Sequence, residues 1–275
     1  MEVRKCCQGI FKANKDIRYM SEDKREKLKE FYFQIKECME CELGKTRTNF
    51  VFGRGNSSAE IVFIGEAPGR NEDLQGKPFV GQAGKILDEL LLSIGFNRSD
   101  VFIANVLKCR PDENRDPKLE EINKCKRYLL EQIEIIDPKI ICTMGKYSTQ
   151  LILNTDTAIT SLRGKVFRVE NRIVLPINHP AAALYTPSRF GILKEDFQKI
   201  KRILDNYENP GNIASLSDLA ETGETGVASA TGSFGLEAAD SLLSDSNSSI
   251  NAEKGPAVSA ESDLQKSKNE QLGLF

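Results

Sequence analysis

A loop rich in glycine and acidic side chains is the part of this sequence best suited to chemistry. Residues 65–84 read GEAPGRNEDLQGKPFVGQAG and contain five glycines and two prolines. So many glycines allow backbone amides to approach a ligand closely. The loop also carries Glu66, Glu72, Asp73 and one aromatic residue, Phe79. Carboxylates beside one ring suit a pocket that stacks a flat molecule and handles a water or a proton. The pattern of a phosphate-binding P-loop is absent.

The segments on either side of this loop indicate where it lies in the fold. Residues 61–64, IVFI, are typical of a buried parallel strand, and residues 85–94 are typical of an amphipathic helix. Ligands of open α/β sheets bind beyond the carboxyl ends of the strands. We therefore expect the loop to form one wall of a ligand site at that edge.

Two further polar residues follow predicted strands. Asn105 lies near the end of the apolar segment 101–107, and His179, the single histidine of the chain, follows the predicted strand 172–177. Both should therefore reach the same sheet edge as the loop. An Asn side chain offers an acceptor and a donor, which suits the edge of a nucleic-acid base. Taken alone, either residue also fits an ordinary structural role.

Four of the seven cysteines have the spacing of a metal site. Cys38 and Cys41 form a C-x2-C pair after a predicted helix, Cys109 ends a strand, and Cys125 follows sixteen residues later. Such a four-thiolate site could hold zinc or an iron–sulfur cluster, and spacing does not decide between them. The alternative is a set of unrelated buried thiols. Cys142, within a predicted strand, is most simply a small core residue.

The chain alternates strands with helices, which predicts an α/β domain with a largely parallel sheet. We expect helices over residues 21–37, 85–94, 117–136, 145–153 and 188–207. We expect strands over residues 61–64, 101–107, 139–144, 165–169 and 172–177, with a short strand and turn in 48–56. The folded domain should therefore cover residues 21–207, after an N-terminal extension over residues 1–20.

Charge divides the chain at about residue 208. Residues 208–275 hold 11 acidic and 3 basic residues, whereas the net charge of the whole chain is -2. The body is therefore basic, which indicates a polyanionic partner or simply a solvated surface. The composition of residues 208–270 predicts a disordered acidic linker. The sequence lacks a signal peptide and an apolar run that could cross a membrane, so we expect a cytoplasmic protein.

Three motifs in the right order give this chain a family resemblance. Residues 65–69 (GEAPG), Glu72-Asp73 and residues 76–81 (GKPFVG) resemble motif A of the family 4 uracil-DNA glycosylases. Residues 179–182 (HPAA) resemble the second motif, and the cysteine pattern is similar to that of the family's iron–sulfur ligands. The resemblance covers residues 31–207. It implies a three-layer α/β/α sandwich, a 4Fe–4S cluster on Cys38, Cys41, Cys109 and Cys125, and uracil-containing single- and double-stranded DNA as the substrate of a monomeric, nucleoid-associated enzyme.

The resemblance also implies roles for the residues of the loop. Phe79 would stack on a flipped uracil, and Glu66 would position or polarise the attacking water. Glu72 would support the loop or the water. The backbone amides of Ala67 and Gly81 would help to hold the base.

Three residues elsewhere in the chain also receive roles from the resemblance. Asn105 would read the edge of uracil and reject cytosine, and His179 would stabilise the departing anion. Leu184 would fill the gap that the flipped base leaves in the duplex.

Two other functions remain open from the sequence. Relatives of this domain form the N-terminal part of phage-type DNA polymerases, so the domain could be a nucleic-acid-binding module without hydrolytic activity. A structural zinc protein could use the same four cysteines. A related group that traps its product covalently carries a KRRIH-type insertion where this chain has residues 110–116, RPDENRD. We therefore do not expect covalent trapping.

The last five residues resemble a protein-binding motif. Gln271, Leu272, Gly273, Leu274 and Phe275 look like the QLxLF motif with which bacterial repair proteins bind the β sliding clamp. Leu272, Leu274 and Phe275 would enter apolar pockets, and Gln271 would provide a polar anchor. The alternative is an apolar terminus without a partner.

Overall fold

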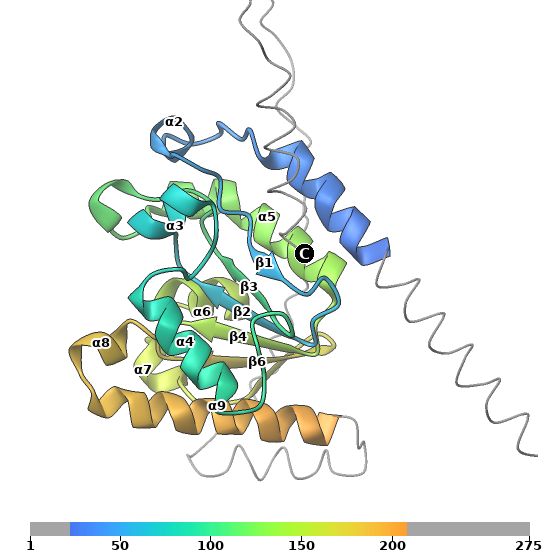
Figure 1. Cartoon of the computed structure of the whole chain (residues 1–275), viewed down its shortest axis with the longest axis vertical. Coiled ribbons are helices and arrows are strands. Elements are labelled where there is room, and N and C mark those ends of the chain that lie inside the picture. The colour runs from blue at the N-terminus through green and yellow to red at the C-terminus, as the bar shows by residue number, and fades with distance from the viewer. Residues whose placement is uncertain (1–22, 208–275) are drawn as a thin grey trace, which may run out of the picture.

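The computed structural model describes residues 23–207 of the chain. The predicted N-terminal extension, acidic linker and clamp motif lie outside these residues. Within the described part, six strands form one sheet in the order β1-β3-β2-β4-β6-β5 (Figure 1). The strands are β1 (Arg54–Gly55), β2 (Ile61–Gly65), β3 (Phe102–Asn105), β4 (Ile140–Met144), β5 (Phe167–Val169) and β6 (Arg172–Ile177).

The centre of the sheet is parallel and its two edges are antiparallel. β3, β2, β4 and β6 run in the same direction, β1 pairs antiparallel with β3, and β5 pairs antiparallel with β6. The predicted mainly parallel sheet and the hairpin over residues 165–177 are thus confirmed. Because the four central strands are parallel, the residues that follow β2, β3 and β6 gather at one edge.

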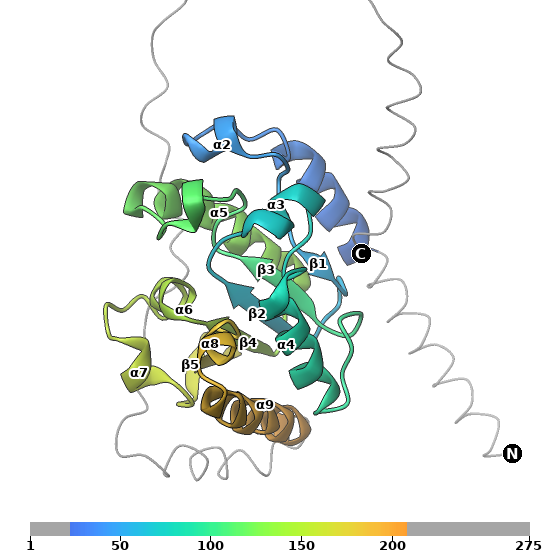
Figure 2. The same ribbon diagram turned by 60° about the vertical axis from the view of Figure 1, so that its left-hand side comes forward.

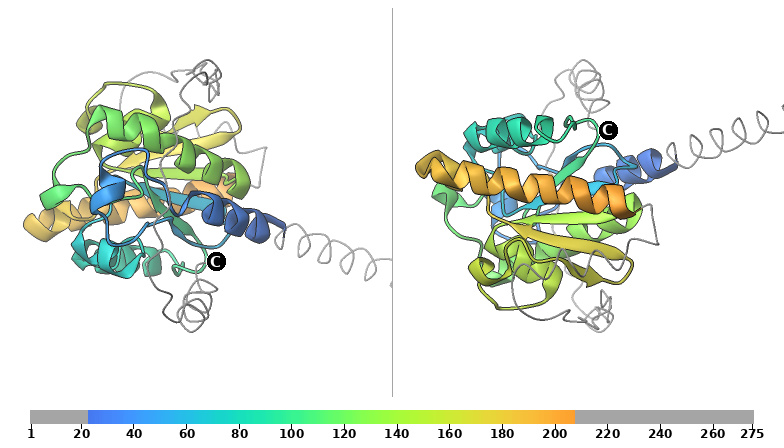
Figure 3. Two further views of the ribbon diagram at one scale, coloured as in Figure 1. Left: turned by 90° about the horizontal axis from the view of Figure 1, so that it is seen from above. Right: turned by 90° about the horizontal axis from the view of Figure 1, so that it is seen from below.

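Helices cover both faces of the sheet, as a three-layer α/β/α sandwich requires. The helix over residues 23–35 and α5 (Leu119–Ile136) pack on one face, and α4 (Gln82–Leu92) and α9 (Ser188–Tyr207) pack on the other (Figure 2). The view from below shows α9 crossing the molecule beside the strands (Figure 3). Along β2, Val62 and Ile64 face the first layer, whereas Ile61 and Phe63 face the second. This alternation explains why β2 is buried on both sides.

Shorter helices lie in the connections between these elements. They are α2 (Leu43–Thr46), α3 (Arg70–Gln75), α6 (Lys146–Leu153), α7 (Ile159–Leu162), α8 (Ala182–Tyr185) and the 3-10 turn Asp112–Asn114. No helix in the described part of the chain is long and apolar enough to cross a membrane.

The structure corrects three of the predicted boundaries. In the segment 48–56 only Arg54–Gly55 is strand, and Gly53 and Gly55 have φ of 137° and 139°. The glycine-rich loop contains a helix, α3, with Glu72 and Asp73 in its first turn, where acidic side chains are favoured. α4 begins at Gln82 rather than residue 85, so Gly84 lies inside the helix. A Cβ at Gly84 would meet the carbonyl oxygen of Phe79 at 1.8 Å.

Candidate functional site

A pocket of about 370 Å³ opens at the carboxyl ends of the central strands. Its walls come from the segments after β2, β3 and β6, which lie far apart in the sequence. Among the predicted site residues it brings together Glu66, Ala67, Glu72, Phe79, Asn105 and His179. Gly81 and Leu184 do not line this pocket.

Phe79 forms an aromatic wall of the pocket with His179. The two ring centroids are 5.4 Å apart, and the ring planes are inclined by 28°. Phe79 has φ of 53°, a conformation that is strained for an aromatic residue. The guanidinium of Arg98 holds this turn by donating hydrogen bonds to the carbonyl oxygens of Pro78 (3.1 Å) and Phe79. Arg98 therefore holds the backbone of the turn that carries the ring.

Asn105 presents a buried acceptor to the pocket. It is the last residue of β3, and its side chain is 2% exposed. Within the described residues its Oδ1 has no hydrogen-bond partner. A Cβ at Gly65 would lie 2.4 Å from this oxygen, so only glycine leaves room for it. A buried oxygen without a donor is costly, and a ligand that supplies an N–H would remove that cost.

His179 is held as a neutral imidazole. Its Nδ1 accepts a hydrogen bond from the backbone N–H of Ala181, at 3.2 Å. Burial lowers the pKa of His179 to about 4, against a weaker opposing effect of the Glu72 carboxylate. With Nδ1 acting as acceptor in the neutral ring, the hydrogen is on Nε2. His179 therefore offers a neutral N–H donor at physiological pH.

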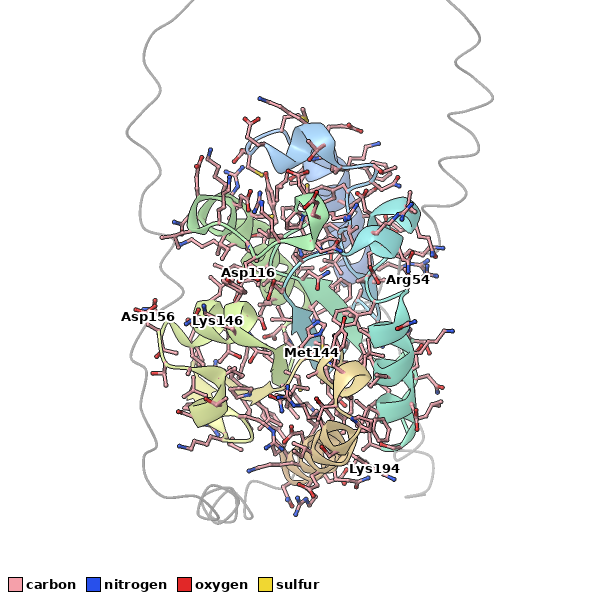
Figure 4. All side chains as sticks on the ribbon, turned by 90° about the vertical axis from the view of Figure 1, so that its left-hand side faces the viewer. Arg54, Asp116, Met144, Lys146, Asp156 and Lys194 are labelled. Carbon is pink, nitrogen blue, oxygen red and sulfur yellow. The ribbon has the colours of Figure 1, made fainter. Side chains whose placement is uncertain are left out.

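Glu66 has a carboxyl group that titrates near neutrality. Its pKa is raised to about 7, mainly by burial and also by the Asp116 carboxylate, against an opposing effect of the Lys146 ammonium. Asp116 in turn accepts a hydrogen bond from the Tyr147 hydroxyl, at 2.8 Å. Figure 4 places Asp116 and Lys146 on the side of α6. A carboxyl group with this pKa can act as a proton acceptor at neutral pH.

Asp116, Tyr147 and Lys146 act on the site although their sequence positions did not predict a role there. Asp116 belongs to the loop after β3, whereas Tyr147 and Lys146 belong to α6. The sequence offered one signal, the position of Asp116 after a strand that ends at the same edge as β2.

Glu72 lines the pocket and also organises the loop through one of its carboxylate oxygens. Its Oε1 accepts hydrogen bonds from the backbone amides of Val80 and Gly81, both at 2.9 Å. The Gly81 amide, which was expected to bind the base, is therefore already used within the protein. Of the two roles that the sequence left open for Glu72, its contacts support the structural one. The Ala67 segment does line the pocket.

Leu184 lies on α8, next to the pocket but outside it. Its side chain is 38% exposed, and the neighbouring Tyr185 is 87% exposed. Ala181, three residues before Leu184, lines the pocket. Leu184 is therefore a partly exposed surface residue near the pocket and not part of its wall.

The four predicted ligand cysteines meet at a separate place in the fold. Cys38, Cys41, Cys109 and Cys125 line one small cavity, and none of them forms a disulfide. Within residues 23–207 no group of three or more His, Cys, Asp or Glu side chains is arranged to hold a metal ion.

Several hydrogen-bond donors surround the sulfur atoms of this cavity. The backbone N–H of Lys108 donates to the Cys125 Sγ at 3.3 Å. The guanidinium of Arg47 donates to the Cys109 Sγ at 3.4 Å, and the Tyr128 hydroxyl donates to the Cys38 Sγ at 3.1 Å. Donors of this kind stabilise thiolates that ligate a metal centre. Cys142 is fully buried in β4 and packs on the opposite face of the sheet, in the core beneath α4 and α9.

Comparisons with known proteins point to one family. Residues 52–205 match the family model described as the uracil DNA glycosylase superfamily. The chain is 50% identical over 183 residues to the type-4 uracil-DNA glycosylase of Archaeoglobus fulgidus, a match that covers 64% of this chain and 92% of the relative. It is 42% identical over 185 residues to the type-4 uracil-DNA glycosylase of Thermotoga maritima, covering 66% and 96%. A DNA polymerase of Bacillus phage SP01 is 32% identical over 162 residues, covering 58% of this chain but only 17% of the polymerase.

Proposed function

The chain belongs to the type-4 group of the uracil-DNA glycosylase superfamily, and we infer that it hydrolyses the N-glycosidic bond of deoxyuridine in DNA. The reaction releases uracil and leaves an abasic site, so this is a hydrolase of DNA repair. The similarity to the phage polymerase covers a small part of that protein and supports a binding module less well.

We propose that Asn105 selects uracil inside the pocket. The observation that carries this proposal is its buried Oδ1, which has no partner within the described residues. This oxygen can accept the N3–H of uracil, and the Asn105 amide group can donate to O4. Cytosine presents an acceptor at N3 and a donor at its exocyclic amine, so it would oppose both groups. The Phe79 ring provides the surface on which the flipped base stacks.

His179 supports departure of the base. As the N1–C1′ bond breaks, uracil leaves as an anion with negative charge on O2. The Nε2–H of a neutral imidazole donates to that oxygen, and the ring is neutral at physiological pH because the pKa of His179 is about 4. A donor positioned in advance for a developing oxyanion contributes on the order of 10²–10³ in rate.

Glu66 is the group best placed to act on water. A water molecule that attacks C1′ must lose a proton, and the Glu66 carboxylate can accept it because its pKa is about 7. A carboxylate there also stabilises the positive charge that develops on the sugar. Leu184, exposed beside the pocket, is the side chain that we propose enters the duplex in place of the flipped base.

Uracil release from a single-stranded oligonucleotide tests this function directly. We expect the full-length protein to release uracil, and we expect Asn105→Ala and His179→Ala each to lower the single-turnover rate by about 10²–10³. Asn123→Ala, an exposed change on α5, is a matched control that should keep the normal rate. Normal excision by both pocket variants would refute the assigned roles. No excision by the unaltered protein would favour a binding module.

We further propose that Cys38, Cys41, Cys109 and Cys125 hold a 4Fe–4S cluster. Support comes from four thiols around one cavity and from the donors aimed at their sulfur atoms. Such a cluster would be structural, because it would tie the segment after helix 23–35 to β3 and α5. After anaerobic purification, Cys125→Ser should lower the iron content and the visible absorption, whereas Cys142→Ala should change neither. Stoichiometric zinc without iron would overturn the proposal.

We also propose that residues 271–275 bind a DNA sliding clamp and so hold the enzyme near DNA. These residues lie outside the described part of the structure, and the support is the QLGLF sequence itself at the end of an acidic segment. A chain of about 63 residues has a typical reach on the order of 40–50 Å if it behaves as a random coil. Deleting residues 271–275 should abolish clamp binding in a titration and leave uracil release from an oligonucleotide unchanged. Equal clamp binding by both proteins would rule the motif out.

A further inference from the structure

A second and larger cavity lies against the turn that carries Phe79. It has a volume of about 890 Å³ and follows the β1 edge of the sheet. Phe79 lines this cavity as well as the uracil pocket, so the turn over residues 77–80 separates the two. We call the second cavity the basic groove, because its charged lining residues are Arg25, Arg54, Lys77, Lys85, Arg98 and a single carboxylate, Asp88.

The positive charge of the basic groove is largely uncompensated. Asp88 forms its ion pair with Arg98. Within residues 23–207, Arg54, Lys77 and Lys85 form no ion pair with a carboxylate, and the buried Nε of Arg25 has no hydrogen-bond partner. Cations that gather in a cavity without carboxylate partners create a strong positive potential, which attracts anions.

The shared turn connects the basic groove to the DNA strand that bears the uracil. A uracil stacked on Phe79 leaves its sugar and phosphate at the mouth of the pocket, on the far side of one turn from the groove. The next phosphates of the same strand must then lie against the protein surface beside the pocket, and the basic groove is part of that surface. Asn56, Ser57 and Ser99 add polar groups to the groove, and such side chains commonly contact phosphate and sugar.

The placement of the charges indicates on which side of the pocket the DNA strand continues. In Figure 4 Arg54 lies on the side of α4, across the molecule from Asp116 and Lys146. On that other side the Lys146 ammonium opposes the effect of the Asp116 carboxylate on Glu66, so charges of both signs are present there. A polyanion is therefore favoured on the side of the basic groove, where the cations largely lack carboxylate partners.

We propose that the basic groove binds the phosphodiester backbone of the uracil-bearing strand on one side of the flipped nucleotide. This proposal rests on the glycosylase function given above. Arg54, Lys77 and Lys85 neutralise successive phosphates. Arg98 both lines the groove and holds the Phe79 turn, so strand binding there also supports the wall against which the base stacks.

The test compares two full-length triple variants with the same change of charge. The groove variant carries Arg54→Gln, Lys77→Gln and Lys85→Gln. The control carries Arg168→Gln, Lys194→Gln and Arg202→Gln, which lie on β5 at the opposite sheet edge and on α9. Binding is measured with a uracil-free single-stranded oligonucleotide across a range of salt concentrations, so that the result does not depend on excision.

We expect DNA binding by the groove variant to depend less steeply on salt concentration. Each phosphate contact on a single strand contributes about 0.7 to the slope of log K against log salt, so three lost contacts should lower the slope by about 2. The control should keep the slope of the unaltered protein. In kcat/KM measurements, nucleotides added to one side of the uracil should help the unaltered protein and not the groove variant.

Either of two results would overturn the proposal. One is an unchanged salt slope in the groove variant, and the other is an equal loss in the control. Uracil release by the unaltered protein separates this outcome from a failure of the glycosylase function, because a glycosylase whose DNA follows another path would still release uracil.

Discussion

The raised pKa of Glu66 leads us to predict that uracil excision becomes faster as the pH rises towards 7. Its carboxyl group titrates at about 7 because burial and the Asp116 carboxylate disfavour the charged form. If Glu66 must be ionised to accept a proton from water, kcat/KM rises with pH and levels off above about 7. His179 adds no second step in this range, because its pKa is about 4.

The size of the effect follows from the titration itself. Two units below its pKa about one carboxyl group in a hundred is ionised, since each unit changes the ratio tenfold. At pH 5 kcat/KM should therefore be about a hundredfold below its plateau. Glu66→Gln should lower the plateau and abolish the pH-dependent rise.

Two neighbouring substitutions should move the profile in opposite directions. Asp116→Asn removes a negative charge that raises the pKa of Glu66, so the rise should shift to lower pH. The asparagine can still accept the hydrogen bond from Tyr147. Lys146→Gln removes a positive charge that lowers the same pKa, so the rise should shift to higher pH.

The assay is single-turnover release of uracil from a short single-stranded oligonucleotide between pH 5 and 9, at substrate concentrations that give kcat/KM. This parameter reports ionisation in the free enzyme, the state in which these charges act on Glu66. Shifts of the same sign in both variants would refute the electrostatic reasoning. A pH-dependent rise that persists in Glu66→Gln would refute the assignment of Glu66.

Stability should depend on Glu66 in the same pH range. Because the folded-state pKa is above the usual value of 4.5, the neutral form is the one that the fold prefers. Its stabilising effect is complete below pH 4.5 and is lost as pH rises through about 7. Glu66→Gln should therefore raise the melting temperature at pH 8 but not at pH 4. Solvent screening at this partly exposed side chain moderates the gain.

Three further predictions concern the pocket and its support. In Gly65→Ala the new methyl group would meet Asn105 Oδ1 at 2.4 Å and the Phe79 ring at 2.8 Å. Excision should therefore fall sharply, and overpacking should lower the free energy of unfolding in urea by about 1–3 kcal/mol. Normal kinetics would contradict this geometry. In Lys108→Met the carbonyl oxygen of Asn105 and the side chain of Gln132 lose their buried donor. We expect the free energy of unfolding to fall by about 2–4 kcal/mol, and a decrease below about 1 kcal/mol would argue against these contacts. Nitrogen NMR of the single histidine at pH 6 should show a neutral His179 with its hydrogen on Nε2, and a charged ring would contradict the assignment.

The sequence alone determined the chemistry-bearing residues and the order of the main elements. Strands and helices alternate with clear apolar patterns, and the carboxyl ends of parallel strands must share an edge. That rule was sufficient to bring Glu66, Asn105 and His179 together from three distant segments, and the pocket confirms that they meet. The cysteine spacing was likewise sufficient to select four thiols, which the structure places around one cavity.

Only the tertiary structure decided what surrounds each of these residues. Local patterns do not show that the Gly81 amide donates a hydrogen bond to Glu72. They also do not show that position 84 must be glycine because the carbonyl oxygen of Phe79 leaves no room for a side chain. The pKa of Glu66 depends on burial and on Asp116 and Lys146, which come from other parts of the chain. The basic groove also combines distant segments. Burial and electrostatic potential are sums over neighbours in space. Which residues are neighbours is determined by the tertiary fold, so local sequence patterns do not predict these properties.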